Sequence, residues 1–244
     1  MSSSPTAAII VVGNEILSGK VPDSNAQFLI KELRELGIKL EAIFVIPDNW
    51  QTISEAVARL EKRFSIVFTM GGIGPTHDDV TLLGVADGLK MMLKRNSKYE
   101  ELLREFHGNG TNEAVLKMAE MPAETELVFP EDVKIPVIKV RNFYVFPGEP
   151  ELFKKQFLAI KEKLRSNQFS SKIIYIKAYE EEIASVLDQA QNQFPETEIG
   201  SYPDYRNQDY KVRVIIDSKD ANLNQKAADY ILERIPGKSI AKVE

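Results

Sequence analysis

Two adjacent aspartates, Asp78 and Asp79, close a glycine-rich stretch, GGIGPTHDD at residues 71–79, which follows the apolar run RFSIVFTM. Glycines let a backbone approach a ligand closely, and the amides at a helix N-terminus carry partial positive charge that suits a phosphate. Two carboxylates beside a phosphate repel it unless a divalent cation such as Mg²⁺ lies between them. The stretch therefore predicts a site for a phosphate-bearing ligand and a cation.

Two further segments follow apolar runs in the same way. GNEILSG at 13–19 comes after AAIIVV, and PGEP at 147–150 comes after NFYVF. The ligand crevice of an open α/β sheet lies outside the carboxyl ends of its strands, so we expect all three segments at one site. Candidate metal ligands or water-positioning groups are Asp78, Asp79 and Glu15, and candidate hydroxyl donors to the ligand are Thr76 and Thr81.

Each motif also has a purely structural explanation. A glycine-rich turn before a helix is more often only a turn, an aspartate at a helix start is more often a cap, and Glu15 alone could be a surface residue. Capping uses one aspartate, however, and explains neither the second nor the extra glycines. His77 is not expected to bind metal, because the chain has only one other histidine, His107.

Strand and helix patterns alternate along the first part of the chain. Strands are predicted at 7–12, 39–47 and 64–70, with a helix from Asn25 to about Leu36 and another, capped by Asp48, that carries Ile53, Val57 and Leu60. This order predicts a parallel sheet with helices on both faces. Residues 80–120 are expected to be mostly helical, and short strands near 124–129, 136–140 and 142–146 precede a helix that ends near 164.

A polar stretch, RSNQFSS at 165–171, marks the predicted domain boundary. We expect one domain at 1–168 and a second at 169–244. The second reads strand, helix, strand, strand, helix, which predicts a small α+β subdomain with an antiparallel sheet.

Composition excludes several functional classes. The net charge of −5 leaves no basic surplus for a nucleic acid or an anionic membrane. The 244 residues include no cysteine, which excludes disulfides, thiolate nucleophiles and cysteine-based zinc sites. The opening MSSSPTAA lacks the features of a secretory signal, and the run AIIVV is too short to span a bilayer. We therefore expect a cytoplasmic protein without a nucleic acid or membrane partner.

Three motifs, VGNEILSGKVPDSNAQFL, GGIGPTHDDVT and RNFYVFPGEPELF, resemble the molybdopterin-binding superfamily of the MogA and MoaB proteins and the CinA N-terminal domain. They look most like the molybdopterin-binding-like N-terminal region of animal FAD synthase, as do GSYPDY and YKVRVIIDS in the second domain. GGIGPTHDDVT is the strongest signal. The resemblance implies an α/β fold, with a three-layer α/β/α domain around a mostly parallel sheet, a small C-terminal α+β subdomain, and assembly into a homo-oligomer.

The resemblance also implies which residues contact the ligand. Asp78 matches the FAD synthase version of the motif, whereas Asn14 stands where the family usually has aspartate. An amide cannot carry the negative charge of a metal ligand or base, so activity is expected to be weakened or to depend on Glu15 and Asp79. The implied loop comprises Gly71, Gly72, Gly74, Pro75, Thr76, Asp79 and Thr81; the early turn comprises Gly13, Asn14 and Glu15; and the late turn comprises Pro147, Gly148 and Pro150.

For activity, the resemblance implies hydrolysis of a dinucleotide pyrophosphate, either FAD to FMN and AMP or ADP-ribose, with Mg²⁺, Mn²⁺ or Co²⁺. A cation would neutralise developing charge and a carboxylate would orient water. The adenylating domain of FAD synthase is absent, so this chain alone is not expected to make FAD. Two alternatives remain open: a regulatory domain that binds a flavin or nucleotide without hydrolysing it, and binding or adenylation of molybdopterin in molybdenum cofactor synthesis.

Overall fold

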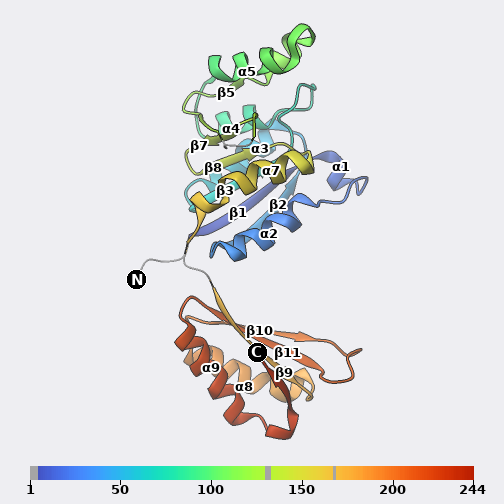
Figure 1. The fold of residues 1–244 in the computed structure, drawn as a ribbon, viewed down its shortest axis with the longest axis vertical. Coiled ribbons are helices and arrows are strands. Elements are labelled where there is room, and N and C mark those ends of the chain that lie inside the picture. The colour runs from blue at the N-terminus through green and yellow to red at the C-terminus, as the bar shows by residue number, and fades with distance from the viewer. Residues whose placement is uncertain (1–4, 130–132, 167–168) are drawn as a thin grey trace. The chain divides into compact units, whose positions relative to one another are not determined.

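The computed structural model describes residues 5–129, 133–166 and 169–244. The chain forms two compact units, residues 1–166 and residues 167–244 (Figure 1). Each unit has its own main sheet and its own buried core.

The first unit is built on a six-stranded sheet in the order β2-β1-β3-β8-β7-β6. The first four strands in this order run parallel, and β7 and β6 are antiparallel to their neighbours. The predicted mostly parallel sheet is therefore confirmed. The strands are β1 (Thr6–Val12), β2 (Lys39–Ile46), β3 (Ile66–Met70), β6 (Glu126–Val128), β7 (Val137–Val140) and β8 (Phe143–Phe146).

Helices cover both faces of this sheet, as the alternation of strands and helices predicted (Figure 1). Even-numbered side chains of β1 pack with α3 (Trp50–Leu60) and α4 (Thr81–Gly88). Odd-numbered side chains of β1 pack with α2 (Asn25–Glu35) and α7 (Pro150–Ile160), which a short 3₁₀ helix, Lys161–Leu164, follows. Burial on both faces is the reason why β1 is a continuous apolar run.

The region from 80 to 120 is less helical than predicted. Two strands, β4 (Leu93–Arg95) and β5 (Glu120–Pro122), pair in an antiparallel sheet. Between them in the sequence lie the helices α5 (Ser97–His107) and α6 (Glu113–Lys117), with a 3₁₀ turn at Gly108–Gly110. Strands of three residues are too short for the alternation of apolar and polar side chains that would reveal them. The predicted break at 107–112 is confirmed as the end of α5 and the start of α6.

The prediction that Asp48 caps the second long helix is wrong. The N-cap of α3 is Asn49, whose Oδ1 accepts a hydrogen bond of 2.9 Å from the Thr52 amide. Asp48 Oδ2 instead accepts a hydrogen bond of 2.7 Å from the backbone amide of Asn14. Asparagine and aspartate cap helices about equally well, so the sequence did not distinguish the two neighbours.

The second unit is the predicted small α+β fold. Its antiparallel sheet has the order β10-β11-β9-β12, and α8 and α9 pack against one side of it. Strand β12 was not predicted, because its four residues, IAKV, carry little pattern of their own. The elements are β9 (Ser170–Ile176), α8 (Glu180–Gln193), β10 (Glu198–Pro203), β11 (Val212–Ser218), α9 (Ala221–Arg234) and β12 (Ile240–Val243), with a 3₁₀ turn at Gly237–Ser239.

Within the described residues, no helix has both the length and the apolar character that crossing a membrane requires.

Candidate functional site

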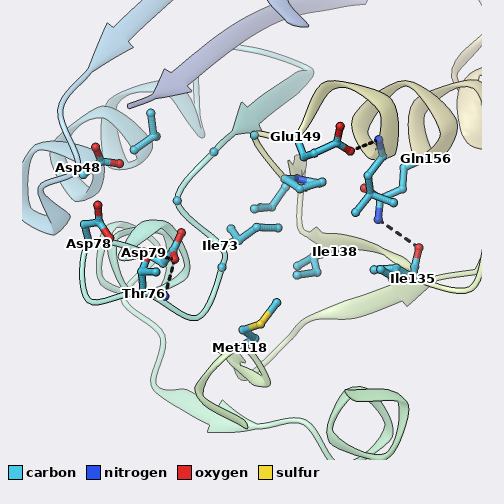
Figure 2. Close-up of a pocket in the computed structure, with 18 of the residues that line it drawn as sticks. Asp48, Ile73, Thr76, Asp78, Asp79, Met118, Ile135, Ile138, Glu149 and Gln156 are labelled. Atoms are coloured by element: carbon cyan, nitrogen blue, oxygen red, sulfur yellow. Dashed lines mark hydrogen bonds between the residues drawn. The ribbon is translucent and has the colours of Figure 1, made fainter. Parts of the chain in front are cut away.

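A cavity of about 340 Å³ lies at the carboxyl ends of the parallel strands, lined by the segments that follow β1, β2, β3 and β8 (Figure 2). Strand β1 lies between β2 and β3. The connection after β1 therefore leads to the strand on one side of β1, and the connection after β2 leads to the strand on the other side. Such a switch in strand order is where open α/β sheets bind ligands. The predicted convergence of the three segments is therefore found in the structure.

The turn after β3 depends on two glycines with positive φ, Gly71 at 96° and Gly72 at 66°. A Cβ on Gly71 would lie 2.2 Å from the carbonyl oxygen of Val12, which ends β1. A Cβ on Gly148 would lie 3.4 Å from the Gly71 Cα, so the late turn packs directly against the glycine turn. These glycines bring three chain segments together at the floor of the cavity.

Thr81 stabilises the glycine turn through two hydrogen bonds. Its hydroxyl donates a hydrogen bond of 2.9 Å to the Gly71 carbonyl, and its amide donates one of 2.9 Å to the Gly72 carbonyl. The residue is fully buried, and it is not among those that line the cavity. In this structure the Thr81 hydroxyl therefore donates its hydrogen bond to the glycine turn, whereas the sequence analysis predicted that it would donate to the ligand.

The aspartate pair lies at one side of the cavity (Figure 2). Asp79 Oδ2 accepts hydrogen bonds from the Thr76 amide, at 2.7 Å, and from the Thr76 hydroxyl, at 2.5 Å. The neighbouring Thr76 side chain also lowers the pKa of Asp78 below its ordinary value of 3.8. Neither aspartate caps α4, because that helix begins at Thr81 and its N-cap, Val80, makes no side-chain capping bond. The capping explanation of the motif is wrong.

Two more carboxylates reach the same cavity. The Glu15 side chain folds over Gly13, since a Cβ there would lie 2.5 Å from Glu15 Oε1. Asp48, through its bond to the Asn14 amide, ties the end of β2 to the segment after β1. Asp48 is a site residue that the sequence analysis missed, although its position directly after a parallel strand was a usable signal.

The predicted ligand contacts divide into two groups. Those that line the cavity are Glu15, Gly71, Gly72, Gly74, Thr76, Asp78, Asp79, Pro147 and Gly148. Those that do not line it are Gly13, Asn14, Pro75, Thr81 and Pro150.

The carboxylates do not form a metal site by themselves. In the part of the chain that the structure describes, no group of three or more acidic, histidine or cysteine side chains could hold a metal ion. Mg²⁺ is commonly bound through one or two carboxylates plus substrate oxygens. The donor set thus fits a divalent cation only when the bound ligand supplies further oxygens.

The opposite side of the cavity is apolar. The apolar residues of the lining include Ile73, Met118, Ile138, Val145 and Leu152, and Figure 2 shows Ile138 and Met118 away from Asp48 and Asp78. Burial raises the pKa of Tyr99, which also lines the cavity, to about 12, so its phenol stays neutral at physiological pH. The cavity therefore combines an acidic side, which carries the aspartates, with a largely apolar one.

Glu149 lines the cavity and is the N-cap of α7. Its carboxylate accepts hydrogen bonds from the amides of Glu151, at 3.0 Å, and Leu152, at 2.6 Å. These two bonds lower the pKa of Glu149 below its ordinary value of 4.5. The negative charge of Glu149 thus stabilises the N-terminus of α7.

Replacement of Glu149 by glutamine should reduce stability in a pH-dependent way. A carboxyl whose pKa is lower in the folded chain stabilises the fold above its unfolded pKa, and this contribution is lost as the pH falls through the folded value. We expect Glu149→Gln to unfold at lower urea than the wild type at about pH 7, and the difference to shrink as the pH falls below 4.5. A difference that persists unchanged at about pH 3 would contradict this assignment.

Comparisons with known proteins match both units. Residues 8–166 match the family model described as "Probable molybdopterin binding domain", and residues 168–244 match "FAD synthase, middle domain". A protein of Archaeoglobus fulgidus is 35% identical, over 80% of this chain and 84% of its own. A "Probable FAD synthase" of Caenorhabditis elegans is 27% identical, over 97% of this chain and 51% of its own. The chain thus spans about half the length of that relative.

The fold is similar to that of a solved structure. It is the protein CinA of unknown function from Thermoplasma acidophilum, with a TM-score of 0.60 and 25% identity, covering 66% of this chain and 99% of its own. This likeness agrees with the three-layer arrangement described above.

Proposed function

The chain belongs to the molybdopterin-binding domain family, and on that premise we propose that its cavity binds a dinucleotide and hydrolyses the pyrophosphate with the help of a divalent cation. The substrate class is FAD, cleaved to FMN and AMP, or ADP-ribose. The match of the second unit to the middle domain of FAD synthase supports a flavin dinucleotide.

One observation carries the proposal. Glu15, Asp48, Asp78 and Asp79 line the same cavity as the glycine turn, in addition to Glu149, whose carboxylate caps α7. That many negative charges beside a backbone suited to phosphate are hard to explain without a cation. Hydrogen bonds from Thr76 occupy one oxygen of Asp79, and the backbone amide of Asn14 occupies one oxygen of Asp48. Glu15 lies in the first turn of a short helix, α1 (Asn14–Leu17).

The residues divide the work as follows. Asp78 and the second oxygen of Asp79 would hold the cation together with pyrophosphate oxygens, and Mg²⁺, Mn²⁺ or Co²⁺ would neutralise the charge that develops on the leaving phosphate. The turn at Gly71 and Gly72, which lines the cavity, would face the pyrophosphate. Glu15 would accept a hydrogen bond from the attacking water and so orient it.

A product analysis tests the proposal. The protein is incubated with FAD or with ADP-ribose, each with EDTA, Mg²⁺, Mn²⁺ or Co²⁺, and the nucleotides are separated by chromatography. We expect FMN and AMP from FAD, or AMP and ribose 5-phosphate from ADP-ribose, only when a cation is present. If both dinucleotides stay intact with every cation, hydrolysis is excluded.

The second candidate is a binding domain without hydrolytic activity. It is favoured by the finding that the described residues offer no cluster of three metal-binding side chains. It is also favoured by Asn14, whose uncharged side-chain amide stands where the resembled family usually has an aspartate. Its ligand would be a flavin nucleotide or, from the family description, molybdopterin. Calorimetric titration with FAD and with molybdopterin distinguishes the two, and measurable binding without product would favour this candidate.

A further inference from the structure

Gln156 is a buried polar residue in the wall of the cavity. It lies on α7, is only 2% exposed, and lines the apolar side away from the aspartates (Figure 2). Its amide nitrogen, Nε2, donates hydrogen bonds of 3.1 Å to the carbonyl oxygens of both Ile135 and Pro136.

These two bonds determine which way the amide points. A carbonyl oxygen only accepts hydrogen bonds, so the atom that faces Ile135 and Pro136 must be the nitrogen. The other atom, Oε1, is buried and has no hydrogen-bond partner among the described residues. A buried acceptor without a partner costs stability, and such groups are rare unless a ligand or water completes them.

The surroundings of Gln156 restrict what that partner is. Ile138, Val145, Leu152 and Met118 provide apolar surface, and Tyr99 is neutral. The charged carboxylate of Glu149 also lines the cavity, and it is bound to the first amides of α7. A second, mostly apolar cavity of about 570 Å³ shares Tyr99, Met118, Ile135 and Pro136 with the first, so the two cavities adjoin at these residues. An uncharged, flat group with a hydrogen-bond donor at its edge suits these surfaces, whereas a phosphate does not.

We propose that the apolar side of the cavity is a subsite for a planar heterocycle, whose ring-edge N–H or amino group donates a hydrogen bond to Gln156 Oε1. This inference rests on the proposed function. There the pyrophosphate lies beside the aspartates, and the subsite would bind one of the two rings of the same dinucleotide. Helix α7 begins beside the late turn at Gly148, so one rigid element connects the turn that contacts Gly71 with the ring acceptor. Adenine, through its amino group, and isoalloxazine, through N3–H, share the required chemistry.

Binding experiments with matched ligands distinguish the two rings. AMP is compared with purine riboside 5′-monophosphate, which lacks the amino group, and FMN is compared with FMN methylated at N3. Each ligand is titrated calorimetrically into the wild type, into Gln156→Met, and into Gln189→Met as a control. Gln189 is exposed on α8 in the other unit, so the same substitution there should change nothing.

We expect one of the two pairs to differ by about tenfold in affinity for the wild type and for Gln189→Met, because the modified ligand leaves Oε1 unpaired. In Gln156→Met the difference within that pair should fall below about twofold. The inference is overturned if neither member of either pair binds, if both pairs bind without discrimination by the wild type, or if Gln156→Met discriminates as well as the wild type.

The wild-type comparison needs no variant, so poor folding of Gln156→Met would not remove the test. Hydrolysis is measured separately with FAD and ADP-ribose. Turnover without ring discrimination would refute this subsite alone, and ring discrimination without turnover would refute hydrolysis alone.

Discussion

Replacing Asp78 by asparagine is expected to lower the rate of FAD or ADP-ribose hydrolysis by at least about 100-fold, because stabilisation by a bound cation is worth several kcal/mol. The substitution keeps the size of the side chain and removes its charge. The Asp78 side chain is 54% exposed, so the fold should be unaffected. Steady-state rates of product formation at saturating cation check this prediction.

Asp188→Asn is a suitable control, since Asp188 is an exposed residue of α8 in the other unit. It should retain the full rate. Full turnover by Asp78→Asn would instead show that Asp78 does not hold the cation. Asp79 is a less direct test, because Asp79→Ala also removes the two hydrogen bonds from Thr76 that shape the loop.

Gly71→Ala is expected to destabilise the first unit by roughly 3 kcal/mol. Part of this loss comes from the positive φ of 96°, which a side chain disfavours. The rest comes from the position of the new Cβ, 2.2 Å from the Val12 carbonyl oxygen, which forces the ends of β1 and β3 apart. Urea unfolding followed by the fluorescence of Trp50, the only tryptophan in the chain and a residue of this unit, measures the loss.

Gly19→Ala separates the two contributions. Gly19 also has positive φ, at 70°, but no atom lies within 4 Å of the position of its missing Cβ. This variant should lose only about 1 kcal/mol, the ordinary cost of the backbone conformation. Equal losses in the two variants would mean that the contact between the glycine turn and β1 contributes nothing to stability.

Much of this protein could be predicted from its sequence because the signals are local. The continuous apolar run of β1 predicts a strand buried on both faces, and the order of strands and helices predicts a parallel sheet. Glycines and carboxylates that directly follow such strands then meet at one edge, since parallel strands end on the same side. Glu15, Asp78 and Asp79 were therefore predicted to line one site, and they do line one cavity.

Only the tertiary structure shows which side chains cap a helix, which stabilise a turn and which line the cavity. Asp48 and Asn49 are equivalent as caps in the sequence, and contact with the Asn14 amide brings Asp48 into the cavity. From the sequence, Thr81 was predicted to donate a hydrogen bond to the ligand, but in the structure its hydroxyl donates to the Gly71 carbonyl. Gln156 carries no motif, and its unpaired oxygen arises because the carbonyls of Ile135 and Pro136, far away in the chain, occupy its nitrogen. The roles of Asp48 and Gln156 depend on hydrogen bonds to residues 20 or more positions away, which local residue patterns do not encode.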